Sequence, residues 1–165
     1  MTAPAPAPAP KKDRTVVWIL RCAGCLVIVC VLAILASIAI PAFINYVKRS
    51  KTAEAHTNIT QLASRLEASC DPVRGYAIQT AGPLPAVPGS NKQSANWSAD
   101  PGFSAIGFDP GGPTYYRYEI TSNGENRTVR VQGDLDDDGT LSTYEIQCYG
   151  GCRCDSQPLV THELE

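Results

Sequence analysis

One segment of the chain has the residue types and the spacing of a calcium-binding loop: DLDDDGTLSTYE, residues 134–145. Acidic residues occupy its first, third and fifth places, and a glycine occupies the sixth, where such a loop turns sharply. A hard cation takes six to eight oxygen ligands, and alternate side chains of a tight loop point to the same side. The predicted Ca²⁺ ligands are Asp134, Asp136, Asp138, the carbonyl of Thr140, Ser142 and Glu145.

The alternative for this segment is an acidic hairpin turn that only keeps the chain soluble. Calcium is favoured because four aspartates within residues 134–138 repel one another, which a turn alone does not require. Strand-like sequence on both sides argues against a helix–loop–helix hand, and whether Glu145 ligates calcium depends on how that strand orients its side chain. An isolated loop of this kind binds calcium with a Kd of about 10⁻⁴–10⁻³ M and stabilises its domain by mass action.

The seven cysteines fall into two groups. Three lie in an apolar stretch, where a thiol is a small apolar side chain. The other four, in a polar region, predict disulfides and an oxidising compartment. Neighbours separated by one residue are not expected to bond each other, so one bond should tie the first of the four to the C-terminal cluster, with its partner left open. A zinc site is disfavoured because paired ligand knuckles are lacking. These four are Cys70, Cys148, Cys152 and Cys154.

The apolar stretch, residues 22–44, contains 23 residues and no charge. As a helix it would extend about 34 Å, enough to cross a hydrocarbon core of about 30 Å. A buried core helix is disfavoured, because the Pro- and Gly-rich remainder is too short to surround it. A cleaved secretory signal is disfavoured by the length of the stretch, and lipidation at Cys25 by its position before most of the apolar run.

Charge alone leaves the orientation open, since basic residues precede and follow the span. The four later cysteines place the N-terminus inside the cell and residues 48–165 outside the membrane. That outer part holds ten basic and fifteen acidic residues, and the whole chain has a net charge of −2. Nucleic acid is therefore not an expected partner, whereas membrane lipid is. Residues 1–14 form an Ala/Pro-rich cytoplasmic tail.

The helical pattern continues beyond the membrane, so residues 15–70 are predicted to form one long helix. Pro41 lies inside it and removes one backbone donor, which predicts a kink or a local loosening. Asp71 followed by proline ends the helix. One apolar stripe of the second half is predicted to face a globular head: Ala55, Ile59, Leu62, Leu66 and Cys70.

The head predicted to follow this helix is a small antiparallel sheet. Residues 71–112 are rich in proline and glycine and form a loop region pinned by Trp97, Phe103 and Phe108. Residues 113–165 hold the sheet, the calcium loop and the cysteine-rich end. Strands are predicted at 114–121, 127–132 and 144–148, with a turn at 122–125 between the first two. The predicted fold is α+β, with the helix stripe packed on the sheet.

The long helix resembles that of type IV pilins and pseudopilins. The resemblance is carried by IAIPAFINYVKRSK at residues 38–51 and by LAILASIAIP at residues 32–41. More loosely, WSADPGFSAIGFD at 97–109 and PTYYRYEI at 113–120 resemble the loop and first sheet strand of pilin-like proteins. The resemblance implies a pilin-like fold, contacts with other pilin-like subunits through the N-terminal helix, and a calcium loop in the head. It also implies a bacterial inner membrane, with the N-terminus in the cytoplasm and the head in the periplasm or beyond.

Two residues depart from the pilin pattern. Counting back from Pro41, the leader glycine needed for cleavage corresponds to Ile19, and the glutamate near the mature N-terminus corresponds to Gly24. A bulky β-branched residue does not fit a site that selects glycine, so residues 1–21 are expected to stay attached. Whether the chain assembles into filaments therefore stays open at this point.

Two functional classes follow from these residues. The first is a pilin-like structural subunit of a bacterial envelope filament (a pilus) or a type II secretion-type machine. The alternative is a standalone membrane-anchored extracytoplasmic binding module, whose head ligand the sequence does not identify. An enzyme is not expected, because no nucleophile–base set, catalytic metal triad or phosphate loop is recognisable.

Overall fold

The computed structural model describes residues 14–163. The Ala/Pro-rich tail predicted for residues 1–14 lies outside the described residues except for its last position. The chain divides into two units, Met1–Phe43 and Ile44–Glu165, which we describe separately. The predicted α+β class is confirmed: one long helix is followed by an antiparallel sheet.

Helix α1 runs from Arg14 to Ala68 and contributes to both units. Among the described residues, its stretch Val17–Ala68 is the one helix long and apolar enough to cross a membrane. None of its most apolar part is buried in the protein. A soluble core helix would bury such a surface, so the exposed apolar side chains are consistent with membrane anchoring. The helix passes through Pro41, the predicted kink site, and continues beyond it.

In the second unit, strands follow the helix to the end of the described chain. Their order in the six-stranded antiparallel sheet is β3-β4-β5-β6-β7, and β8 also pairs with β6. Strands β1 and β2 form a separate two-stranded hairpin. The strands are β1 (Cys70–Asp71), β2 (Gly75–Tyr76), β3 (Ala81–Leu84), β4 (Arg117–Asn123), β5 (Asn126–Gly133), β6 (Ser142–Tyr149), β7 (Arg153–Cys154) and β8 (Leu159–Thr161).

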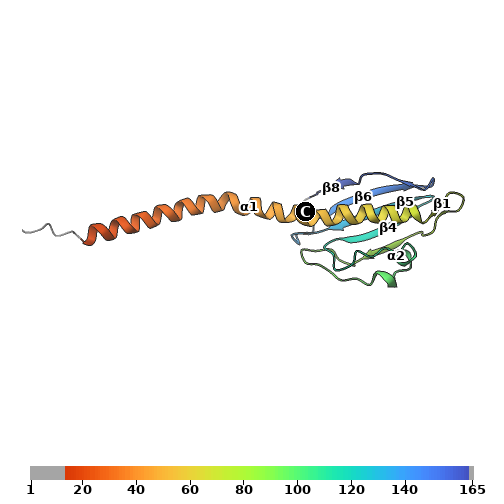
Figure 1. Ribbon diagram of the computed structural model, residues 1–165, viewed down its shortest axis with the longest axis horizontal. Helices are drawn as coiled ribbons and strands as arrows, with labels where there is room; N and C mark the ends of the chain where they lie inside the picture. Colours follow the sequence, from red (N-terminus) through yellow and green to blue (C-terminus); the bar gives the residue numbers. More distant parts are fainter. Residues whose placement is uncertain (1–13, 164–165) are drawn as a thin grey trace, which may run out of the picture. The chain divides into compact units, whose positions relative to one another are not determined.

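The C-terminal part of α1 covers one face of this sheet, as Figure 1 shows for strands β4 to β6. Alternate residues of β4, β5 and β6 are buried and share one core with the apolar stripe of the helix, which confirms the predicted packing of the two. Four residues of the stripe, Ala55, Ile59, Leu62 and Leu66, are completely buried. Polar contacts add to this packing. The carboxylate of Glu54 accepts the backbone N–H of Tyr115 at 2.9 Å.

The segment between α1 and β4 holds more regular structure than the predicted loop region. Besides β3 it contains a 3₁₀ turn, η1 (Trp97–Ala99), and a short helix, α2 (Pro101–Ala105). Asp100 caps α2 by accepting two backbone N–H groups at its start. The aromatic anchors Trp97, Phe103 and Phe108 are buried and stack edge-on or tilted against one another, as predicted.

Two disulfides are formed, one between the segment after α1 and the C-terminal region and one between β6 and β7. Cys70 bonds to Cys152, across 82 residues, and Cys148 bonds to Cys154. The prediction that Cys70 is tied to the C-terminal cluster is confirmed, and its partner is now assigned. Glu67 reinforces this link, because its carboxylate accepts the backbone N–H of Cys154 at 2.6 Å.

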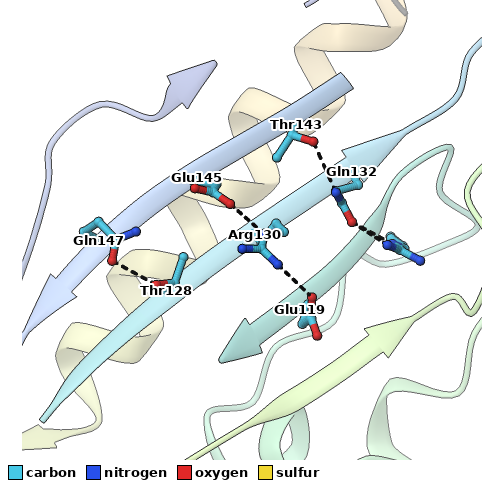
Figure 2. A network of polar contacts seen from close by, with 8 residues as sticks. Glu119, Thr128, Arg130, Gln132, Thr143, Glu145 and Gln147 are labelled. Atoms are coloured by element: carbon cyan, nitrogen blue, oxygen red, sulfur yellow. Dashed lines mark hydrogen bonds and ion pairs between the residues drawn. The ribbon is translucent and has the colours of Figure 1, made fainter. Parts of the chain in front are cut away.

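The opposite face of the sheet carries a network of polar side chains (Figure 2). At its centre, Arg130 of β5 lies between Glu145 of β6, at 2.6 Å, and Glu119 of β4, at 3.7 Å. Gln132 accepts a hydrogen bond from Arg117 and donates one to Thr143. The side chains of the two ion pairs that Arg130 forms are about one-quarter to one-third exposed. Each of these pairs therefore contributes only about 1 kcal/mol or less to the stability of the head.

Candidate metal centre

The predicted calcium loop forms the connection between β5 and β6. The last residue of β5, Gly133, pairs with the first residue of β6, Ser142, so residues 134–141 close the hairpin. Leu135 is buried and anchors the loop to the core, whereas residues 136–140 are exposed. The aspartates that flank Leu135 therefore lie at the solvent-facing end of the sheet.

Three of the predicted ligands come together. One carboxylate oxygen from each of Asp134, Asp136 and Asp138 lies within 4.8 Å of the others. Calcium–oxygen bonds are about 2.3–2.6 Å long, so two oxygens bound to one ion lie no more than about 5 Å apart. The three carboxylates thus fit a single calcium ion. Backbone carbonyls such as that of Thr140, together with water, would be needed to complete its six to eight ligands.

Local hydrogen bonds give the loop its shape. The carboxylate of Asp134 accepts the backbone N–H groups of Asp138, at 3.2 Å, and Gly139, at 3.0 Å. Asp138 in turn accepts the N–H of Thr140 at 2.6 Å. Gly139 has a φ of 87°, a left-handed conformation that favours glycine, at the place where the calcium pattern expects one. The turn that brings the carboxylates together is therefore built into the sequence.

The second unit supplies cationic and polar partners that spacing along the sequence does not reveal. The Lys48 ammonium lies 2.8 Å from a carboxylate oxygen of Asp136. Asp137 is turned to another loop, where it accepts hydrogen bonds from the backbone N–H and the hydroxyl of Ser90. Sequence reasoning missed both contacts, because the partners lie 88 and 47 residues away. Part of the charge of the acidic loop is thus already balanced within the protein.

These hydrogen bonds also hold carboxylates in their ionised form. The hydroxyl and N–H of Ser90 lower the pKa of Asp137, and the backbone N–H of Thr140 lowers the pKa of Asp138. Hydrogen bonds donated to a carboxylate stabilise its charged state. At neutral pH the loop therefore presents anionic oxygens, which is the form that a hard cation binds.

Two predicted ligands lie elsewhere, and the reason is the strand pairing. The hydroxyl of Ser142 is buried and donates to the carbonyl of Gly133 at 3.1 Å. Glu145 lies three residue pairs along β6, about 10 Å from the end of the hairpin, where its carboxylate binds Arg130. Because β6 begins where a helix–loop–helix hand would continue its loop, the ninth and twelfth places do not join the aspartates. The candidate set is reduced to the three aspartates and backbone oxygens.

Comparison of the chain with protein-family models, with curated proteins and with solved structures found no match. The functional assignment below therefore depends on the fold and on the residues described above.

Proposed function

We propose that this chain is a pilin-like structural subunit of a bacterial envelope filament or a type II secretion-type machine. The observation that carries the proposal is the organisation of α1. Its N-terminal part is apolar and unburied within the protein, while its C-terminal part packs on an antiparallel sheet. This division supplies a membrane anchor and a disulfide-bonded head on one helix. In this proposal the exposed apolar surface contacts lipid first and neighbouring subunits after assembly.

In this proposal the role of the head is structural rather than catalytic. The N-terminus is cytoplasmic and the head lies outside the inner membrane, where disulfides persist. A Ca²⁺ ion bound by Asp134, Asp136 and Asp138 would hold together the loop that connects β5 and β6. Because the loop is exposed, the expected affinity is weak, and the ion stabilises the head when calcium is in the millimolar range.

A fractionation experiment tests the assembly. An epitope-tagged full-length chain is expressed in its host, the cells are sheared, and the filament and washed inner-membrane fractions are probed for the tag. Recovery in sheared filaments, or together with other pilin-like subunits, supports the proposal. Exclusive recovery in washed inner membrane would favour the second candidate, a standalone membrane-anchored binding module. The residues that favour this second candidate are Ile19 and Gly24, which replace the residues used in pilin cleavage and assembly.

Calcium binding is tested on the purified full-length chain in detergent. With a Kd of 10⁻⁴–10⁻³ M, 10 mM calcium should stabilise the head by about 1.4–2.7 kcal/mol. The variant Asp136→Asn should lose most of this calcium-dependent gain. Asp109→Asn is the matched control, because Asp109 is an exposed aspartate in another loop, where it accepts the N–H of Gly111. An equal response in both variants would exclude the site.

A further inference from the structure

Arg127 occupies a position of β5 that should be apolar. The inward-facing residues of this strand alternate with outward-facing ones, and Arg127 is on the same face as Val129 and Val131. Its side chain is 3% exposed. Arginine is almost never so deeply buried without a paired charge, because removing the guanidinium from water is costly. Such a break in the strand pattern marks a position where function is expected to override packing.

The contacts of Arg127 satisfy part of its hydrogen-bonding capacity but not its charge. Nε donates to the carbonyl of Ile78 at 2.9 Å, and Nη1 donates to the carbonyls of Gly124, at 2.9 Å, and Asn126, at 2.8 Å. The guanidinium also lies 5.4 Å from the ring centroid of Tyr76. Within residues 14–163, no carboxylate forms an ion pair with Arg127, and its Nη2 has no hydrogen-bond partner.

Arg127 is one of the residues that line a pocket of about 360 Å³. This volume is within the range of small-molecule sites, which is about 300–1,000 Å³. Three charged residues line the pocket: Arg127, the exposed Arg74 and Glu125. Their formal charges leave one net positive charge. Val73, which is 93% exposed, adds an apolar side chain to the lining.

The walls of the pocket are held in place by contacts that do not involve a ligand. The carboxylate of Asp71 accepts the backbone N–H groups of Val73, at 2.7 Å, and Arg74, at 2.9 Å, which shapes the loop that carries both. On the other side, the Tyr76 hydroxyl donates to the carbonyl of Tyr149 at 2.8 Å. The Cys70–Cys152 disulfide joins the same two chain segments. Little ordering is therefore required when a ligand enters.

We propose that this pocket binds a carboxylate group, with Arg127 and Arg74 as its cationic partners. The lining has one net positive charge, which matches the single negative charge of a carboxylate. A dianion such as sulfate carries twice that charge and is repelled more strongly by Glu125. Guanidinium groups match the planar geometry of a carboxylate. The site is at the opposite end of β5 from the acidic loop. It goes beyond the proposed function and requires neither filament assembly nor calcium.

The test is an NMR titration of the ¹⁵N-labelled full-length chain in detergent micelles at pH 7. Sodium acetate is added at constant ionic strength, and the Arg127 Nε–Hε and Gly124 amide signals are followed. Saturable shifts with a Kd in the millimolar range are expected. N-acetylalanine and glucuronate then serve as probes for a peptide or a sugar source of the carboxylate. The probe that binds with the lower Kd identifies whether the carboxylate comes from a peptide or from a sugar.

Replacing the buried Arg127 would disturb the core. The exposed residues Arg74 and Glu125 are therefore substituted instead, so that the test does not depend on folding. Arg74→Gln should weaken acetate about tenfold, the loss expected for one charge-assisted hydrogen bond. Glu125→Gln should tighten acetate severalfold. Arg153→Gln, which removes an exposed charge outside the lining, should leave the affinity unchanged. The proposal is overturned if acetate produces no saturable shift, if sulfate binds equally well, or if Arg74→Gln and Arg153→Gln behave alike.

Discussion

Removing the Cys70–Cys152 disulfide should destabilise the head about twice as strongly as removing the Cys148–Cys154 disulfide. In the chain-entropy model, a cross-link stabilises by restricting the unfolded chain, and its effect grows with the length of the loop that it closes. The two bonds close loops of 82 and 6 residues. The corresponding stabilisation is about 4.5 kcal/mol for the long loop and about 2.2 kcal/mol for the short one.

The comparison requires two double variants, Cys70→Ala with Cys152→Ala and Cys148→Ala with Cys154→Ala, each of which keeps one disulfide. For a unit of this size, 1 kcal/mol shifts Tm by roughly 4 °C. The expected losses are therefore about 18 °C and about 9 °C in the full-length chain. Near-UV circular dichroism is a suitable signal, because three tyrosines of the head are fully buried and report its unfolding separately from the N-terminal part of α1.

The measured losses of stability also contain the packing of the sulfur atoms that are removed. This contribution differs between the two variants, because Cys148 is fully buried and Cys70 is only partly buried. Measuring each variant with its remaining disulfide reduced provides a correction for it, and non-reducing intact mass verifies the bonds that remain. If the long-loop variant loses no more stability than the short-loop variant, restriction of the unfolded chain is not how Cys70–Cys152 acts. The link between α1 and the C-terminal strands would then have to be explained by contacts in the folded head.

Three other substitutions test the packing and the acidic loop. Gly133→Ala should cost about 1–3 kcal/mol in denaturant unfolding, because its Cβ would lie 2.4 Å from the Tyr116 ring, whereas Gly112→Ala, with open space around it, should be nearly neutral. Leu62→Ala should cost about 2–5 kcal/mol because the side chain is completely buried between helix and sheet. Asp137→Asn should destabilise the head at pH 7. Because the pKa of Asp137 is lowered in the folded state, this difference should shrink as the pH falls below about 4, and a pH-independent difference would contradict it.

Local patterns predicted the central hairpin strands well, because alternation and turn residues are encoded over short distances. The strands predicted at 114–121 and 127–132 correspond to Arg117–Asn123 and Asn126–Gly133, with the turn between them as expected. Strand β3 was not predicted. Its sequence, AGPL, has neither alternation nor β-branched residues, and the strand forms by pairing with β4. Tertiary pairing, rather than local preference, determines such an edge strand.

In the candidate metal centre, too, features set by neighbouring residues were predicted, and features set by tertiary contacts were not. The positions of the three aspartates and of Gly139 were predicted, because the turn between them is formed by hydrogen bonds within the loop. Ser142 and Glu145 were also predicted as ligands, but both lie on β6, where their side chains contact Gly133 and Arg130 instead of the aspartates. Lys48 was missed because its ion pair with Asp136 depends on how α1 packs on the head.

The acidic loop and the arginine pocket should act independently, although both are attached to β5. Arg127 and Asp134 are seven residues apart along an extended strand, or about 23 Å. Sites at this distance with no shared partner usually contribute additively, and coupling requires an element with two alternative arrangements that both ligands bias. Residues 127–132 of the strand between them are paired on both sides, which opposes such a rearrangement. We therefore expect the acetate affinity to be the same with 10 mM calcium as with a chelator. By thermodynamic reciprocity, saturating acetate should leave the calcium affinity unchanged as well. A change of more than about threefold in either direction would show that the sheet transmits binding from one end of the head to the other.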